Sequence, residues 1–371
     1  MKSRFLLILA LLLSIGFVLA ACGSSEEGES SGDGGDSSEE GGEEAAADDD
    51  FSVAMVTDVG GVDDKSFNQS SWEGLQAFGD ENGLEEGEGY DYAQSDSEGD
   101  YTTNLSRLVR QDFNLIYGIG YLLQPALEEV AEQNPETNFG LVDSVTEGDN
   151  IVSITFKEHE GSFLAGVAAA LKTETDKIGF VGGEDGDLIR KFESGYVAGA
   201  KSVNPDIEID RQYAESFAAA DKGKLIASNM YNNDIDVIYH ASGATGNGVF
   251  AEAKDRKQNN PDEDLWVIGV DRDQHEEGEI DGNNITLTSM VKRVDVAVNE
   301  VASLTMEGDF PGGEVMEYGL DDDAISIAKT NEDAMTEDIV SEVEEWKEKI
   351  SNGEVEVPST DEELEEFESS L

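Results

Sequence analysis

The loop sequence Asp58-Val-Gly-Gly-Val-Asp-Asp-Lys-Ser-Phe-Asn-Gln69 lies between two recognisable patterns. The apolar run 51–56 before it predicts a buried strand, and Trp72, Leu75 and Phe78 after it recur at helical spacing. A glycine-containing loop therefore joins the carboxyl end of a strand to a helix. In an open α/β sheet, that edge is where ligands bind.

The residue types in this loop suit a small polar ligand with an aromatic face. Asp58 offers a charged acceptor for hydroxyl groups, Phe67 a stacking surface, and Asn68 both a donor and an acceptor. The glycines at 60 and 61 let the backbone approach a ligand closely. The alternative is an ordinary turn in which an aspartate caps the helix and Phe67 packs in the core.

Strand and helix patterns alternate along the rest of the chain, and this predicts an α/β fold with parallel sheets. The alternation runs through residues 51–157 and restarts over 158–284, which predicts two doubly wound lobes. We expect residues 285–330 to return to the first lobe, so that a hinge and a cleft separate the two. Residues 331–371 predict a charged helix over 338–350, followed by a frayed acidic tail.

The amino terminus has the pattern of a secretory signal over residues 1–21: basic residues, an apolar run and small residues. Its end, Leu19-Ala-Ala-Cys22, resembles a bacterial lipobox, which implies a lipid anchor on Cys22 and an extracytoplasmic position at the cell membrane. Residues 22–50 are rich in serine, glycine and acidic residues and predict a disordered tether. Because Cys22 is the only cysteine, a disulfide within the chain and a thiolate zinc site are excluded.

The formal net charge of −61 is extreme. It argues against nucleic acid as a partner, since such binding depends on basic side chains that neutralise phosphate. Adaptation to high salt, which screens the self-repulsion of an acidic chain, is the interpretation we favour. The acidic runs at 321–323 and 361–363 lack the spacing and glycine of a calcium loop, so no metal site is predicted.

Two further polar clusters follow predicted strands. The glycine-rich run 242–248 could hold a ligand through backbone donors, but it lacks the ending of a P-loop. Asp271 and Asp273 follow the apolar run 265–270, where carboxylates could bind a vicinal diol such as that of a ribose, bind a metal, or form a hydrolytic pair. No G-x-S-x-G motif is present, and the three histidines are scattered. The residues give no positive sign of catalysis or of a cofactor.

The opening loop resembles the signature of the basic membrane protein family of ABC-transporter lipoproteins, which includes purine nucleoside receptors. The resemblance covers nearly all of the chain after the tether and implies the type I periplasmic-binding-protein fold. Its further motifs, in the expected order, include Gly118-Ile-Gly-Tyr121, Ser153-Ile-Thr-Phe-Lys-Glu-His-Glu-Gly-Ser-Phe-Leu-Ala-Gly166, Lys177-Ile-Gly-Phe-Val-Gly-Gly183, Phe192-Glu-Ser-Gly-Tyr196, Val270-Asp-Arg-Asp273 and Thr288-Ser-Met-Val-Lys-Arg293.

The resemblance implies that two aromatic rings from opposite lobes, Phe67 and Phe192, enclose a purine base. Stacking of a base on an aromatic side chain contributes about 1–3 kcal/mol. Asn68, together with Asp143, is implied to bind the edge of the base. Neither of these roles follows from spacing or composition.

The remaining contacts implied by the resemblance come from charged side chains and backbone. Asp58, Asp271 and Lys292 would stand near the ribose or the polar atoms of the base, and Gly243 and Gly246 would give backbone contacts. The family often has Gly-Gly-Thr-Gly where this chain has Gly243-Ala-Thr-Gly246, which leaves the contact there open.

The sequence therefore predicts a monomeric, lipid-anchored solute-binding protein of an ABC importer, with a nucleoside as ligand and a membrane permease as partner. Three alternatives stay open: another small solute, a ligand-gated sensor that signals to a membrane partner, and an extracellular nucleoside hydrolase. Product formation would favour the hydrolase, and neighbouring permease and ATPase genes would favour transport.

Overall fold

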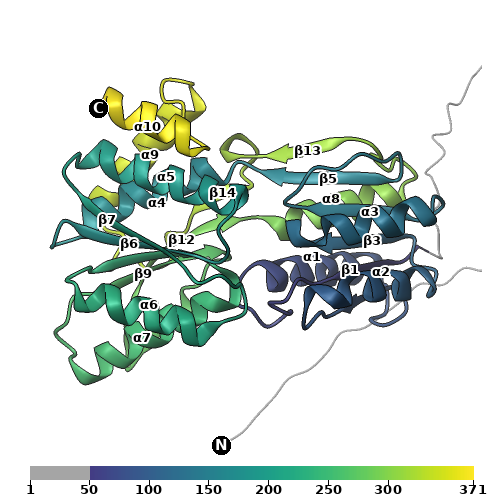
Figure 1. The fold of residues 1–371 in the computed structure, drawn as a ribbon, viewed down its shortest axis with the longest axis horizontal. Coiled ribbons are helices and arrows are strands. Elements are labelled where there is room, and N and C mark those ends of the chain that lie inside the picture. Colours follow the sequence, from purple (N-terminus) through teal and green to yellow (C-terminus); the bar gives the residue numbers. More distant parts are fainter. Residues whose placement is uncertain (1–50) are drawn as a thin grey trace, which may run out of the picture. The chain divides into compact units, whose positions relative to one another are not determined.

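The computed structural model of the chain describes residues 51–371, and these contain two six-stranded sheets flanked by helices (Figure 1). The predicted signal peptide, the Cys22 anchor and the acidic tether lie outside the described residues. We call the sheet that contains residues 53–56, with its helices, the first lobe, and the other sheet with its helices the second lobe.

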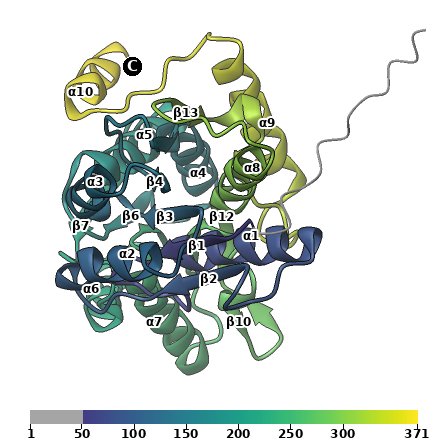
Figure 2. The same ribbon diagram turned by 90° about the vertical axis from the view of Figure 1, so that its right-hand side faces the viewer.

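The sheet of the first lobe is parallel throughout, with strand order β13-β5-β4-β3-β1-β2. Helices α1 and α8 cover one face, and α2 and α3 cover the other (Figure 2). The elements are β1 (Val53–Val56), α1 (Phe67–Asn82), β2 (Tyr90–Ala93), α2 (Tyr101–Val109), β3 (Leu115–Ile119), α3 (Gln124–Gln133), β4 (Asn138–Val142), β5 (Ile151–Phe156), α8 (Val294–Met306) and β13 (Val315–Tyr318).

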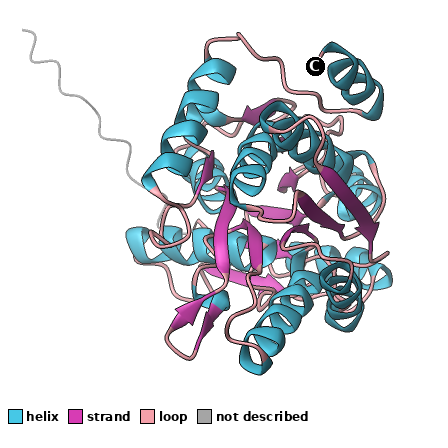
Figure 3. Cartoon of the chain, turned by 90° about the vertical axis from the view of Figure 1, so that its left-hand side faces the viewer, coloured by secondary structure: helices cyan, strands magenta, loops and turns pink. Residues whose placement is uncertain are grey.

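The sheet of the second lobe has strand order β14-β12-β9-β8-β6-β7, and β14 alone is antiparallel. Helices α4 and α5 pack on one face and α6 and α7 on the other (Figure 1), and Figure 3 shows this end of the molecule with the strands in magenta between helices in cyan. The elements are α4 (Glu158–Lys172), β6 (Lys177–Gly182), α5 (Asp187–Val203), β7 (Glu208–Tyr213), α6 (Ala220–Asn232), β8 (Val237–Ala241), α7 (Gly246–Asn259), β9 (Trp266–Asp271), the hairpin β10 (Glu279–Ile280) and β11 (Asn283–Asn284), β12 (Thr286–Lys292), β14 (Ile325–Ile327), α9 (Glu337–Ser351) and α10 (Asp361–Ser370).

The central strands are buried on both faces, as parallel sheets between helices require, whereas the edge strands β7 and β13 are partly exposed. In β1, Val53 and Met55 join the core beneath α1, while Ala54 and Val56 join the core beneath α2 and α3. The apolar run that predicted the first strand is therefore explained by two cores rather than one.

The assignment of residues 285–330 to the first lobe is wrong in part. Strand β12 pairs in parallel with β9 of the second lobe, with Met290 opposite Val270, and β14 then pairs with β12. Helix α8 and strand β13 do belong to the first lobe, as expected. The chain crosses between the lobes at Arg293, after residues 286–291 have paired with β9 of the second sheet.

The prediction of a frayed carboxyl end is also wrong. Residues 361–370 form α10, which contacts α5, while α9 contacts α4, so both helices belong to the second lobe (Figures 1 and 2). Leu364 is buried, and the Thr360 hydroxyl accepts a hydrogen bond from the Glu363 amide at 3.3 Å. The cap, the burial of Leu364 and the packing of Phe367 against Phe163 explain why this acidic segment forms a helix.

Three segments cross between the lobes: around Lys157, around Arg293, and between β13 and β14. Hydrogen bonds join them to one another. The Lys157 amide donates to the Tyr318 carbonyl at 2.8 Å, and the Arg293 amide donates to the Ala324 carbonyl at 2.8 Å. These crossings form the hinge that the sequence predicted.

Candidate functional site

A cavity of about 540 Å³, which includes its part open to solvent, lies between the carboxyl ends of the strands of both lobes. This is the edge at which parallel α/β sheets bind ligands. Of the nine residues predicted to contact a ligand, eight line this cavity: Asp58, Phe67, Asn68, Asp143, Phe192, Gly243, Asp271 and Lys292. The structure thus gathers them at one place, although they come from widely separated parts of the sequence.

The loop after β1 is held by two aspartates with different partners. The Asp58 carboxylate accepts hydrogen bonds from the Gly60 amide at 2.8 Å and from Asn68 Nδ2 at 2.7 Å. Asp64 accepts from the backbone amides of Ser66, Asn68 and Gln69 at 2.9, 2.9 and 3.1 Å, so it satisfies the first amides of α1. Asp64 therefore caps the start of α1, and both aspartates line the cavity.

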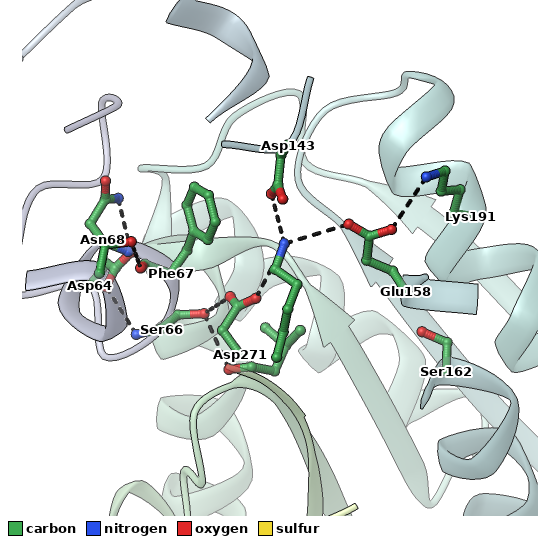
Figure 4. Close-up of polar contacts among 12 residues, drawn as sticks. Asp64, Ser66, Phe67, Asn68, Asp143, Glu158, Ser162, Lys191 and Asp271 are labelled. Carbon is green, nitrogen blue, oxygen red and sulfur yellow. Dashed lines mark hydrogen bonds and ion pairs between the residues drawn. The ribbon is translucent and has the colours of Figure 1, made fainter. Parts of the chain in front are cut away.

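Lys292 is the charged centre of the site. Its side chain is 1% exposed, and its ammonium lies 2.7 Å from Asp143 Oδ2, 3.7 Å from Glu158 Oε1 and 3.9 Å from Asp271 Oδ1 (Figure 4). Glu158 Oε2 lies in turn 3.5 Å from Lys191 Nζ. A buried charge needs such partners, because burial without them is strongly unfavourable.

Asp143 and Asp271 occupy equivalent positions in the two lobes. Asp143 directly follows β4 and Asp271 ends β9, and both have a φ of 66°. Aspartate adopts this left-handed conformation more readily than most residues do. The turn ends each strand and leaves a carboxylate at the cavity, where Asp271 also accepts a hydrogen bond from the Ser66 hydroxyl of the first lobe.

Aromatic rings form the apolar part of the cavity. Phe67 of α1 and Phe192 of α5 come from opposite lobes, and the Lys292 ammonium lies 4.7 Å and 5.6 Å from their ring centroids. At these distances a cation is attracted to the faces of aromatic rings. Tyr121 and Phe217, again from opposite lobes, meet edge to face with centroids 6.2 Å apart.

Burial changes the acidity of the site. Loss of hydration raises the pKa of Asp58 to about 7 and that of Glu158 to about 7. It also raises the pKa of Asp271 to about 6, although the positive charge of Lys292 opposes this shift. Burial would by itself lower the pKa of Lys292, but the carboxylates of Asp143, Glu158 and Asp271 raise that pKa above its ordinary value.

These shifts predict that stability falls as the pH rises from about 4 to about 7. In that window the folded protein retains protons on Asp58, Asp271 and Glu158 that the unfolded chain has already released. Thermal unfolding at constant high salt should therefore show a lower melting temperature at pH 7.5 than at pH 5.5. In the Asp58→Asn variant, the melting temperatures at pH 5.5 and pH 7.5 should differ by less than they do in the wild type. A difference as large as that of the wild type would contradict the raised pKa of Asp58 as a cause.

One predicted contact is not at the site. Gly246 is not among the residues that line the cavity, and a Cβ atom there would lie 2.1 Å from His240 Cε1. Its lack of a side chain is needed so that the start of α7 can pack over the buried imidazole. Gly243, by contrast, lines the cavity and has a φ of 54°.

Sequence reasoning missed several cavity or support residues. Tyr121 and Phe217 follow strands β3 and β7 at the ligand-binding edge, so their position was a usable signal. Asp64 precedes the first turn of a predicted helix, where aspartate commonly caps. Nothing in the sequence indicates that Glu158 pairs with Lys292, because 134 positions separate them along the chain.

Among residues 51–371, no helix is long and apolar enough to cross a membrane. Within the same range, no group of three or more histidine, cysteine, aspartate or glutamate side chains is arranged to hold a metal ion. Where three carboxylates do converge, at Asp143, Glu158 and Asp271, the ammonium of Lys292 is their cation.

A two-lobed α/β fold with a polar and aromatic cavity at the strand ends is the architecture of solute-binding proteins. Residues 51–361 match the family model described as "ABC transporter substrate-binding protein PnrA-like". The chain is 53% identical to the "CD4+ T-cell-stimulating antigen" of Listeria innocua, over 96% of this chain and 99% of that protein. It is 43% identical to the "ABC transporter nucleoside-binding protein BmpA" of Lactococcus lactis, over 97% of this chain and 100% of that protein.

A solved structure described as an ABC transporter solute-binding protein from Aeropyrum pernix has a TM-score of 0.75 and 26% identity, and the match covers 86% of this chain and 98% of that one. The chain belongs to the PnrA-like, or Bmp, family of ABC transporter substrate-binding proteins. It is therefore an extracytoplasmic protein that binds a small molecule and works with a permease, and it is not an enzyme. The predicted family and fold are confirmed, and the hydrolase alternative is set aside.

Proposed function

We propose that the protein delivers a purine nucleoside to an ABC importer and binds it in the cavity between the lobes. The observation that carries this proposal is the combination of aromatic rings from opposite lobes with hydrogen-bond acceptors around one space. Phe67 and Phe192 supply the rings, and both line the cavity. A purine is flat and offers two faces to such rings.

The acceptors favour a ligand rich in N–H and O–H groups. Asp143 Oδ1 is buried and has no hydrogen-bond partner among the described residues, so it can accept from the edge of a base. Asn68 Nδ2 is already engaged by Asp58 and Asp64, and Asn68 Oδ1 accepts from the Asp58 amide at 3.3 Å, so the second lone pair of this oxygen is the one left for a ligand donor. Asp58 and Asp271 are the carboxylates for ribose hydroxyls.

The charges favour a nucleoside over a nucleotide. Four aspartates line the cavity, and Lys292 is the single basic residue among its lining residues in the described part of the chain. Its ammonium is already paired with carboxylates. A phosphate brought into this cavity would meet uncompensated negative charge, which costs affinity at short range.

Calorimetric titration of the purified protein in molar salt tests the proposal. We expect micromolar or tighter binding of adenosine, guanosine or inosine, weaker binding of cytidine, and no binding of guanosine monophosphate. No product should form on long incubation. Absence of heat with all of the nucleosides would refute the choice of ligand and leave the family membership intact. The Lactococcus relative, which is named a nucleoside-binding protein, supports this choice of probes.

The location at the membrane is a further part of the proposal. A signal peptide over residues 1–21, a lipid on Cys22 and an acidic tether to residue 50 would hold a monomer beside its permease. Mass spectrometry of the amino-terminal peptide should find a diacylglycerol-modified Cys22, and the Cys22→Ser variant should be released from membranes. Recovery of an unmodified cysteine from membranes would refute lipidation.

Adaptation to high salt is proposed from the charge of −61. The Debye length is about 3 Å in 1 M salt and about 10 Å in 0.1 M salt, so dilution exposes the surface carboxylates to one another. Dialysis from molar salt into low salt should therefore lower the melting temperature, and an equal osmolality of sucrose should not restore it. A melting temperature independent of salt would contradict this interpretation.

A further inference from the structure

A second set of contacts joins the two lobes outside the cavity. On the first lobe it involves the turn Asp64–Ser66 and Glu73 of α1. On the second lobe it involves three side chains, none of which lines the cavity: Asn247, Arg272 and Gln274. Each contact joins a residue of the first lobe to a residue of the second. The contacts are therefore made only when the lobes lie against each other.

Of these three side chains, Gln274 makes the most hydrogen bonds. Its Nε2 donates to the Lys65 carbonyl of the first lobe at 2.9 Å, and its Oε1 accepts from the Val270 amide at 2.9 Å and from His240 Nε2 at 3.0 Å. Since an amide oxygen only accepts, His240 must carry its proton on Nε2. Gln274 is 1% exposed, so its orientation is fixed by these partners. It thereby ties the end of β9, which bears Asp271, to the opposite lobe.

Arg272 and Asn247 also bind the first lobe. Arg272 Nε and Nη2 bind Glu73 Oε2 and Oε1 at 3.0 and 2.7 Å, a two-pronged contact that fixes direction as well as distance. Asn247 Nδ2 donates to the Asp64 carbonyl at 3.2 Å. Both side chains are partly exposed, so replacing them leaves the cores of the lobes intact.

The turn Asp64–Ser66, to which these side chains bind, has an unusual backbone conformation. Lys65 has a φ of 65°, a region that a lysine adopts rarely. This conformation presents the Lys65 carbonyl to Gln274, while Ser66 donates to the Val270 carbonyl at 3.3 Å and to Asp271. A strained turn persists only where its surroundings hold it. The hydrogen bonds from the second lobe supply part of the interactions that keep the turn in this conformation.

We propose that Asn247, Arg272 and Gln274 form a latch that holds the lobes closed and sets how long a bound ligand stays. They are positioning residues, since they act on the Asp64–Ser66 turn and on Asp271 rather than on the ligand. The statement on residence time rests on the proposed function, whereas the statement on lobe closure does not. A lost hydrogen bond changes such an equilibrium by about two- to tenfold.

Pulsed electron paramagnetic resonance on the full chain tests the closure. Spin labels are placed on exposed positions of the two lobes, as Glu129→Cys in α3 and Leu225→Cys in α6, with Cys22→Ser to remove the native thiol. The double variant Asn247→Ala/Arg272→Gln should shift the distance distribution, with more of the population at a distance other than the closed one. The matched control is Lys224→Gln, which removes an ion pair with Asp255 inside the second lobe.

Stopped-flow release of guanosine tests the residence time. The double variant should release guanosine about tenfold faster, with little change in the association rate and none in the ranking of nucleosides. Glu73→Gln, on the first lobe, should reproduce part of the effect. An unchanged distance distribution in the double variant would overturn the latch, as would an unchanged release rate. If no nucleoside binds, the proposed ligand fails and the distance measurement still decides the latch.

Discussion

Replacing Lys292 with methionine should lower the free energy of unfolding by about 3–5 kcal/mol at pH 8, the largest effect on stability that we expect from one substitution at the site. The ammonium is buried among Asp143, Glu158 and Asp271, at 2.7, 3.7 and 3.9 Å. Methionine has a similar length but no charge, so three buried carboxyl groups lose their common partner. Chemical denaturation in molar salt would measure the loss.

The pH dependence of this loss of stability shows whether it comes from the missing charge of Lys292 or from a packing defect. At pH 5 the carboxyl groups with raised pKa can take up protons, so the difference between the Lys292→Met variant and the wild type should shrink. A packing defect would cost the same at both pH values. Lys224→Met, which removes an exposed ion pair with Asp255, is the control and should leave stability unchanged. Equal stability of the Lys292→Met variant and wild type would refute the central role of this ion cluster.

Replacing Phe67 with alanine should weaken nucleoside binding by about ten- to a hundredfold, since stacking on a base contributes about 1–3 kcal/mol. The ring lies at the start of α1, is partly exposed, and lines the cavity. Because it is not a fully buried core residue, its loss should change the melting temperature little. Calorimetric titration with guanosine and thermal unfolding of the same sample would separate the two effects.

Phe310→Ala is a matched control for Phe67→Ala. Phe310 is also half-buried, but it follows α8 and does not line the cavity. Its replacement should leave guanosine affinity unchanged. Parallel losses of affinity and stability in the Phe67→Ala variant would instead identify Phe67 as a packing residue, which is the alternative that the loop sequence left open.

Local patterns predicted the strands and helices well because each depends on neighbouring residues. The apolar run 51–56 correctly predicted β1, and the helical spacing of Trp72, Leu75 and Phe78 correctly predicted α1. The sheet to which β12 belongs could not be predicted in this way. The sequence of β12 fits either sheet, and the choice depends on the distant partner strand β9.

The candidate site was predictable where position and chemistry coincide. Asp58 lies in the loop after β1, Phe67 and Asn68 begin α1 at the end of that loop, and Asp271 ends β9. All four line the cavity. Support contacts were not predictable, because they depend on side chains that meet only in three dimensions. The pairing of Glu158 with Lys292 is one such contact, and the packing of Gly246 against His240 is another.

The three hinge crossings determine which contacts survive when the lobes separate. Segments that are bonded to one another bend together, so the lobes turn about a pivot through them rather than slide apart. Lys292 directly precedes one crossing and Glu158 directly follows another, but both belong to the second lobe, so their ion pair does not change when the lobes rotate. Gln274 and Arg272 lie outside the crossing segments. Their contacts with the first lobe are therefore farther from the pivot and separate more when the lobes rotate. Lys292 thus keeps Glu158 and Asp271 beside it during rotation, while Asp143 moves with the first lobe, so an entering ligand finds part of the charged cluster already assembled.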